Sequence, residues 1–264
     1  MSSVYLQELL NVMAQLRDPE HGCVWDKQQT YQSIVPHTLE EAYEVAETIE
    51  SEDLDALPGE LGDLLFQVVF YAQIAKEEGR FDFNDVCKKI TDKMIKRHPH
   101  VFSDVKIDSV DEQSRLWEEI KKDERATDKG DKVKSLLDGV STALPGLAVA
   151  KKLQTRAANV GYDWPDIQGP IEKLEEEFEE VKHAITEGTT EQIKDEIGDL
   201  LFCAVNIARH MNVDPDAALR HANRKFIRRF KGMEALCEAN EQIFSELSLD
   251  EMEAYWQRVK RETE

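Results

Sequence analysis

The sequence of 264 residues lacks the features that are typical of zinc-binding, membrane-spanning and secreted proteins. Its four cysteines, Cys23, Cys87, Cys203 and Cys237, are widely scattered and form no Cys-x-x-Cys pair, which argues against a zinc site and favours free thiols in a reducing cytosol. No apolar run approaches the ~20 residues of a membrane span, and the first residues lack the basic and apolar regions of a signal peptide. We therefore expect a cytoplasmic protein with no membrane partner.

Positive charge is also scarce, because 33 Lys+Arg stand against 54 Asp+Glu and give a formal charge of −21. This balance argues against a nucleic-acid partner, which needs a basic face, and against an anionic membrane surface. An anionic substrate would need a cation to bridge it to the protein. The 41% of hydrophobic residues are enough for one or two globular domains.

The chain contains an internal repeat at an offset of about half its length. Residues 39–70 resemble residues 174–206, with an offset of 135 at the first acidic motif and 136 at the second, after a predicted one-residue insertion in the loop. The matches are Leu39-Glu40-Glu41 with Leu174-Glu175-Glu176, Glu44 with Glu179, Glu60 with Glu196, Asp63 with Asp199, and Lys93 and Arg97 with Lys225 and Arg229. The repeat predicts two domains, at residues 1–125 and 139–264, joined by a charged linker at 126–138.

Apolar residues recur at helical spacing in nearly every segment, and no convincing alternating strand is present. In the second copy the predicted apolar stripe follows steps of three and four: Ile171, Leu174, Phe178, Val181 and Ile185. The next helix is predicted to begin at Thr189, where Gln192 completes a capping-box pattern. The fold class is therefore all-α, with two helical units.

Carboxylates spaced three residues apart on two successive helices indicate a divalent-cation site. In the second copy these are Glu176 with Glu179, and Glu196 with Asp199. A short connection makes the helices antiparallel neighbours, so the four acids could converge and bind Mg²⁺, which prefers oxygen ligands. The first copy offers Glu41, Glu44, Glu60 and Asp63. The simpler alternative is a solvated acidic face, and Thr38–Glu41 also fits a capping box.

Two basic residues on one helix face, Lys225 and Arg229, suit phosphate oxygens, although taken alone they are better explained by surface ion pairs with neighbouring acids. Trp256 and Lys260 lie one turn apart near the end of the chain. Without other information, Trp256 is more simply a core residue. We find no clear counterpart of this Trp256–Lys260 helix after the first copy.

Together these motifs resemble the MazG nucleoside triphosphate pyrophosphohydrolases of the all-α NTP pyrophosphatase superfamily. The resemblance extends to residues 16–26, 97–102, 159–164 and 223–226, and so covers essentially the whole chain. It implies Mg²⁺-dependent hydrolysis of nucleoside triphosphates to monophosphate and pyrophosphate, with Mn²⁺ as an alternative ion and little discrimination among bases. It further implies tandem MazG-type domains, four-helix units completed in a homodimer, and a role in nucleotide-pool cleaning or nutritional stress.

Carried over by position, the resemblance assigns Glu176, Glu179, Glu196 and Asp199 as metal ligands. It assigns a catalytic role to Glu175 and Glu176, with Glu175 acting on the attacking water. The nucleotide would be held by Glu175, Asn223, Lys225, Arg229, Trp256, Lys260 and Lys121. The equivalent first-copy residues are Glu40, Glu41, Glu44, Glu60, Asp63, Lys93 and Arg97. Because Thr91 stands where the second copy has Asn223, we expect the first site to be weak or inactive and the second domain to be the main catalytic one.

Two other functions remain open from the sequence. A di-iron carboxylate protein needs Glu-x-x-His on two helices, and Glu180-x-x-His183 supplies one such match. A non-catalytic helical nucleotide or metal sensor would use the same acidic residues without turnover.

Overall fold

The computed structural model describes residues 2–103, 109, 112–113, 116–117, 120 and 135–263. These residues contain helices and no strand, so the all-α prediction is confirmed. The chain divides into two compact units, residues 1–130 and 131–264. The domain limits 1–125 and 139–264 stay a prediction, and most of the linker lies outside the described residues. None of the described helices combines the length and apolarity needed to cross a membrane.

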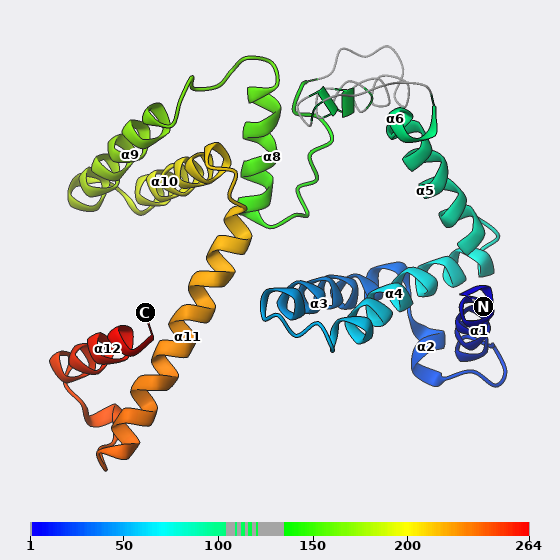
Figure 1. The fold of residues 1–264 in the computed structure, drawn as a ribbon, viewed down its shortest axis with the longest axis horizontal. Helices are drawn as coiled ribbons and strands as arrows, with labels where there is room; N and C mark the ends of the chain where they lie inside the picture. The colour runs from blue at the N-terminus through cyan, green and yellow to red at the C-terminus, as the bar shows by residue number, and fades with distance from the viewer. Residues whose placement is uncertain are drawn as a thin grey trace. The chain divides into compact units, whose positions relative to one another are not determined.

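The first unit is built on a pair of long helices, α3 (Tyr31–Glu50) and α4 (Leu57–Glu77), joined by a short turn and lying side by side (Figure 1). Around them lie α1 (Ser2–Leu16), α2 (Val24–Gln28), α5 (Phe83–Arg97) and α6 (Pro99–Phe102). The core is formed by α1, α3 and α4 through Met13, Ile34, Val69, Phe70 and Ile74.

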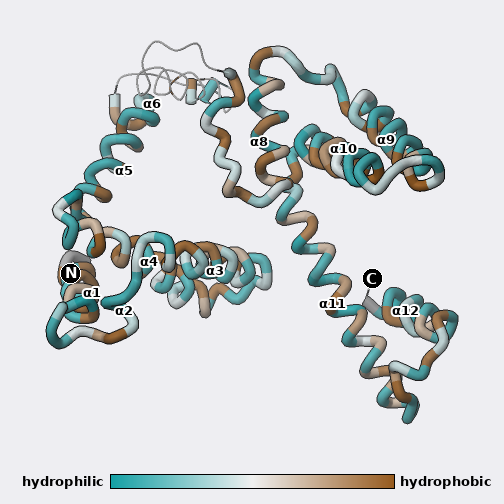
Figure 2. Tube along the Cα trace, turned by 180° about the vertical axis from the view of Figure 1, so that it is seen from behind, coloured by the Kyte–Doolittle hydropathy of each residue, from teal (hydrophilic) through white to brown (hydrophobic). Residues whose placement is uncertain are grey.

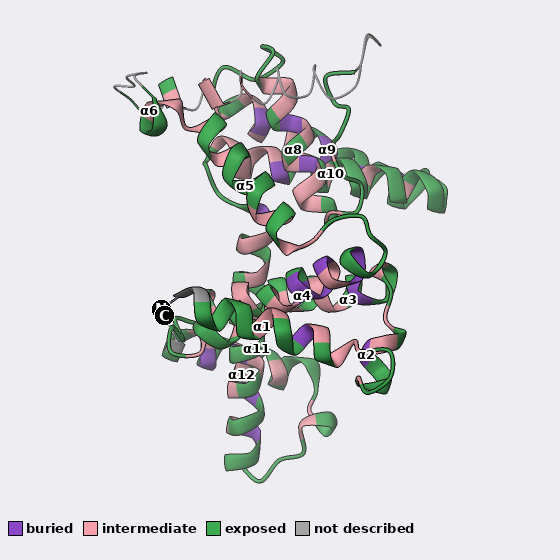
Figure 3. Cartoon of the chain, turned by 90° about the vertical axis from the view of Figure 1, so that its right-hand side faces the viewer, coloured by how far each residue is buried: buried purple, intermediate pink, exposed green. Residues whose placement is uncertain are grey.

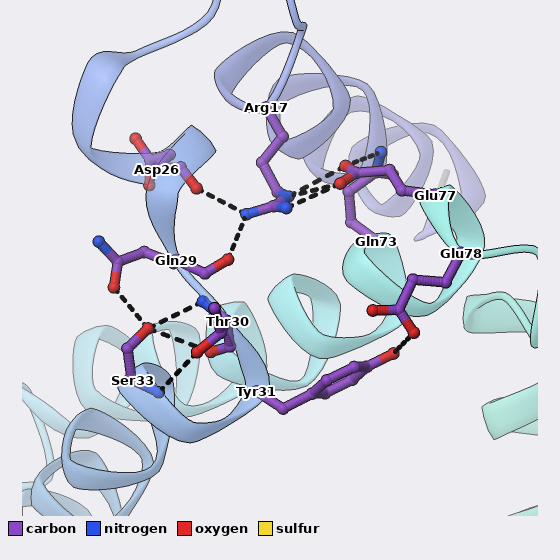
Figure 4. A network of polar contacts seen from close by, with 9 residues as sticks. All are labelled: Arg17, Asp26, Gln29, Thr30, Tyr31, Ser33, Gln73, Glu77 and Glu78. Carbon is purple, nitrogen blue, oxygen red and sulfur yellow. Dashed lines mark hydrogen bonds and ion pairs between the residues drawn. The ribbon is translucent and has the colours of Figure 1, made fainter.

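Arg17, whose side chain is 7% exposed, links the segment before α3 to α4 (Figure 4). The Arg17 guanidinium donates to the carbonyl oxygen of Asp26 at 2.6 Å and forms an ion pair with Glu77 at 2.7 Å, which ties α1, α2 and the end of α4 together. Thr30 and Ser33 then form a reciprocal capping box that begins α3. The capping box considered at Thr38–Glu41 is wrong, because Thr38 lies inside α3.

The second unit repeats this helix pair as α9 (Gln168–Glu187) and α10 (Thr190–His210), which α8 (Gly146–Ala158) contacts from one side. A two-residue connection joins α9 to α10, and the predicted capping box of Thr189 and Gln192 is confirmed. The long α11 (Pro215–Ala239) follows and is packed against α12 (Leu249–Thr263) beyond the short 3₁₀ helix η1 (Phe244–Glu246) (Figure 1).

The apolar stripes of α9 and α10 are only partly covered within the chain. Apolar positions recur along both helices (Figure 2), yet the buried positions are few (Figure 3). Val181, Ala184 and Val205 are buried, whereas Phe178 is 49% exposed. The other large apolar side chains exposed on these helices are Ile185, Ile197, Leu201 and Phe202. The predicted apolar stripe of α9 is therefore only partly buried within the single chain.

Candidate active site

Each unit gathers three carboxylates from its central helix pair. In the first unit these are Glu41 of α3 with Glu60 and Asp63 of α4, and in the second they are Glu177 of α9 with Glu196 and Asp199 of α10. In each cluster one oxygen of every carboxylate lies within 4.8 Å of the others. The antiparallel pairing of the two helices therefore brings the acid of the first helix together with two acids of the second, which lie 19 and 22 residues further along the sequence.

The two clusters correspond at a single offset of 136, because Glu41, Glu60 and Asp63 map onto Glu177, Glu196 and Asp199. The predicted offset of 135 at the first motif, with a one-residue insertion after it, is therefore wrong. Glu177, and not Glu176, lies beside Glu196 and Asp199. At the same offset, Glu44 of the first unit corresponds to Glu180 of the second and not to Glu179.

The three residues of α9 that were predicted as site residues lie on the exposed side of this helix. Glu175, Glu176 and Glu179 are all exposed and lie outside the acidic cluster. Glu179 forms an ion pair with Lys182 at 2.7 Å. The candidate di-iron residue His183 is 73% exposed in its side chain, lies 3.8 Å from Glu187, and is likewise outside the cluster.

Glu177 occupies an unusual environment for a carboxylate. The residue is only 5% exposed, on the same face of α9 as Pro170, Val181 and Ala184. Its Oε1 lies 2.8 Å from the ammonium of Lys173, while its Oε2 is buried and has no hydrogen-bond partner among the described residues. A buried anionic oxygen without a partner is costly, and a bound cation would remove that cost. The donor set, three carboxylates and no nitrogen or sulfur, suits a hard cation such as Mg²⁺.

Mutual repulsion marks both clusters. Desolvation and the neighbouring charge of Glu177 raise the pKa of Glu180 above its ordinary value. Desolvation, followed by the charges of Asp63 and Glu44, likewise raises the pKa of Glu41. Like charges held close together disfavour ionisation, and a cation between them would reverse this effect.

The basic and aromatic residues of the second unit meet on a different helix pair. Arg229 of α11 is buried, and its Cζ lies 5.7 Å from the centre of the Trp256 ring of α12. The ring of Phe226 packs against the same tryptophan, with 5.5 Å between the two ring centres. Asn223 and Lys225 are exposed on α11, and Lys260 is half-buried on α12. Trp256 is thus an arginine-contacting, partly exposed ring rather than a fully buried core residue.

The first unit has the counterpart that we did not find in the sequence. Arg97, the match of Arg229, lies with its Cζ 5.4 Å from the centre of the Trp117 ring, and His98 contacts the same ring at 5.0 Å. Trp117 also precedes Lys121 by four residues, as Trp256 precedes Lys260. Lys121 itself lies outside the described residues, and Lys93 is exposed on α5.

The fold and the paired clusters define a tandem all-α protein with a carboxylate site and an arginine–tryptophan contact in each unit. The family model of the MazG nucleotide pyrophosphohydrolase domain matches residues 29–102 and 168–233. The chain is 49% identical over 259 residues to the nucleoside triphosphate pyrophosphohydrolase of Escherichia coli K12, covering 97% of both chains. It is 42% identical over 259 residues to the nucleoside triphosphate pyrophosphohydrolase/pyrophosphatase MazG of Thermotoga maritima, covering 98% of this chain and 97% of that protein.

A more distant relative is the nucleoside triphosphate pyrophosphohydrolase of Mycobacterium tuberculosis, which is 34% identical over 157 residues, or 59% of this chain and 46% of that protein. The chain belongs to the MazG nucleotide pyrophosphohydrolase family, a family of enzymes, as the sequence motifs predicted.

Proposed function

We propose that this protein hydrolyses nucleoside triphosphates to nucleoside monophosphate and pyrophosphate, with Mg²⁺ as the required ion and Mn²⁺ as an alternative. The relatives that match the whole chain carry the corresponding activity in their names. The main support is Glu177, which lies in the cluster with Glu196 and Asp199 and whose buried Oε2 has no hydrogen-bond partner among the described residues. This protein's strong negative charge makes a bound cation the simplest way to hold a triphosphate.

The cation would be held by Glu177, Glu196 and Asp199, with Glu180 next to them. Bound Mg²⁺ would neutralise charge on the phosphate oxygens and activate a water for in-line attack at the α-phosphorus. Because the register moves by one residue, the carboxylate that accepts a proton from the water becomes Glu176 instead of Glu175. Glu176 directly precedes Glu177 and is exposed, so its carboxylate can contact a solvent water beside the cation site.

The triphosphate and base would be held by the basic and aromatic residues of α11 and α12: Asn223, Lys225, Arg229, Trp256 and Lys260. Arg229 and Lys225 provide positive charge one helical turn apart for phosphate oxygens. Trp256 offers a ring for base stacking, which tolerates any base, and we therefore propose broad base specificity.

We also propose that the protein acts as a homodimer. The cluster on α9 and α10 and the Arg229–Trp256 contact occupy different helix pairs of the second unit. Five large apolar side chains of α9 and α10, including Phe178, remain exposed in the single chain. A second copy packed on this face would bury them and complete a four-helix unit. A cytoplasmic role in nucleotide-pool cleaning or nutritional stress completes the proposal.

The second unit is proposed as the main catalytic one. Glu177 is buried, whereas its counterpart Glu41 is only half-buried, and Thr91 stands in the first unit where the second has Asn223. The presence of a tryptophan is not a difference between the units, because Trp117 contacts Arg97 as Trp256 contacts Arg229. Glu177→Gln should therefore lower the rate more than Glu41→Gln.

Pyrophosphate release from several nucleoside triphosphates, with Mg²⁺ or with EDTA, tests this function. Losing several kcal/mol of charge stabilisation should make Glu177→Gln at least about a hundredfold slower. Glu180→Gln should also lose activity, whereas Glu179→Gln should stay near wild type, because Glu179 pairs with Lys182 outside the cluster. Equal losses at Glu179 and Glu180 would contradict the register, and nucleotide binding without turnover would favour a sensor.

A further inference from the structure

Lys173 lies one helical turn before Glu177 on α9 and makes two close contacts. Its Nζ is 2.8 Å from Oε1 of Glu176 and 2.8 Å from Oε1 of Glu177. The side chain of Glu177 is 6% exposed and that of Glu176 is 58% exposed, so the ammonium bridges a buried and a solvated carboxylate.

The two carboxylate oxygens of Glu177 differ in their hydrogen-bond partners. Oε1 is occupied by the ammonium, and Oε2 is the buried oxygen without a partner among the described residues. The last torsion of a glutamate side chain has broad minima, so the backbone and the rotamer alone do not fix which way the carboxylate plane faces. A strong charge-assisted hydrogen bond to one oxygen does fix it, and the other oxygen is then presented to the cluster.

The first unit differs at this position. At the offset of 136 that relates the two clusters, Lys173 corresponds to His37. The Nδ1 of His37 lies 3.7 Å from Oε2 of Glu40, the counterpart of Glu176, and no contact of His37 with Glu41 is seen in the described part of the chain. The first cluster therefore lacks the lysine that fixes the second, although the three carboxylates are the same.

We propose that Lys173 is a positioning residue, which holds Glu177 with Oε2 turned toward Glu196 and Asp199 and thereby raises the cation affinity of the second cluster. This inference depends on the proposed cation site. Groups that orient metal ligands from outside the coordination sphere typically contribute 10- to 100-fold to metal affinity. A competing view is that the ammonium repels the cation, in which case removing it would tighten binding.

Direct Mn²⁺ binding to the full-length protein without nucleotide, followed by electron paramagnetic resonance, separates these views. We expect Lys173→Met to weaken Mn²⁺ binding about tenfold and Lys173→Arg, which keeps the charge and the donors, to restore most of it. Lys182→Met is the matched control, because Lys182 forms a 2.7 Å pair with Glu179 on the same helix but outside the cluster. Circular dichroism would establish that each variant keeps its helices.

Kinetics give a second readout. Lys173→Met should raise the Mg²⁺ concentration for half-maximal pyrophosphate release by about tenfold, while Lys182→Met should leave it within about twofold of wild type. Unchanged or tighter Mn²⁺ binding in Lys173→Met, or equal weakening in Lys182→Met, would overturn the inference. If the wild type binds Mn²⁺ but releases no pyrophosphate, the proposed function fails, and the binding comparison still decides the role of Lys173.

Discussion

Replacing Glu177 by glutamine should make the metal-free protein more stable and the protein in Mg²⁺ relatively less stable. The substitution removes a buried charge whose Oε2 has no partner among the described residues. The Lys173 ammonium still has an ionic partner after the substitution, because it keeps its 2.8 Å contact with Glu176. Glu177→Gln therefore tests a cation site without emptying the space that the side chain fills.

The magnitude follows from two opposing changes. Losing the charge-assisted contact at Oε1 with Lys173 costs about 1.5–3 kcal/mol. Removing the charge from the buried Oε2, which has no partner among the described residues, gains more than the roughly 1–3 kcal/mol typical of a neutral group. The net change in EDTA should be a stabilisation of roughly 1 kcal/mol, or about 2–4 °C in the melting temperature of a chain this long. In the wild type, Mg²⁺ at a hundred times its dissociation constant should add about 2.7 kcal/mol, and the variant should lose most of this gain.

Differential scanning calorimetry in EDTA and in Mg²⁺ measures both effects, and Glu179→Gln serves as the control at an exposed position. We expect the melting curves of wild type and Glu177→Gln to exchange order when Mg²⁺ is added. A variant that is less stable than wild type in both buffers, with the same Mg²⁺ response, would refute the reasoning. Glu177 would then be a structural partner of Lys173 and not part of a cation site.

Three further predictions address the nucleotide contacts, the first unit and the pH dependence of stability. Trp256→Ala should raise KM for every nucleoside triphosphate by about tenfold, since stacking is worth about 1–3 kcal/mol per base, and steady-state kinetics would show it. Arg17→Met should lower the free energy of unfolding by about 1–3 kcal/mol in urea titrations, because it removes a charge-assisted contact with the partly exposed Glu77 carboxylate and leaves the Asp26 carbonyl without this donor. Hydrogen bonds from Arg209 hold the pKa of Asp163 below its usual range. The stabilisation is therefore present above the unfolded carboxyl pKa of about 3.9 and is lost as pH falls through the lower folded pKa, so Asp163→Asn should flatten the acid limb of the melting-temperature profile.

The fold could be predicted because its signals are local. Helical spacing of apolar residues, the capping box at Thr189 and the duplicated acidic motifs each specify a helix or its end without knowledge of packing. The antiparallel neighbours followed from the short connection between α9 and α10. These features were also enough to predict that Glu196 and Asp199 lie on the face of α10 that meets α9.

The identity of the acid from α9 could not be predicted from periodicity. Residues 172–180 contain six carboxylates, so any register places some acid on each face of the helix. Packing against α10 decides which one is buried, and it selects Glu177 while leaving the apolar Phe178 exposed. A usable signal was present, because Glu44 precedes Glu60 by the same 16 residues that separate Glu180 from Glu196. Trp117 was missed because its distance from Arg97 differs from the distance between Arg229 and Trp256, and only the ring contacts reveal the match.

The central claim is that Glu177, Glu196 and Asp199 hold the cation on which a triphosphate is cut. A crystal structure with Mn²⁺ and a triphosphate analogue that resists cleavage between the α- and β-phosphates tests it most directly. We expect an anomalous-scattering peak at a coordination distance of about 2.1 Å from oxygens of all three carboxylates and from a phosphate oxygen. A peak held by Glu176 and Glu179 instead, or a bound analogue with no ion at this cluster, would contradict it.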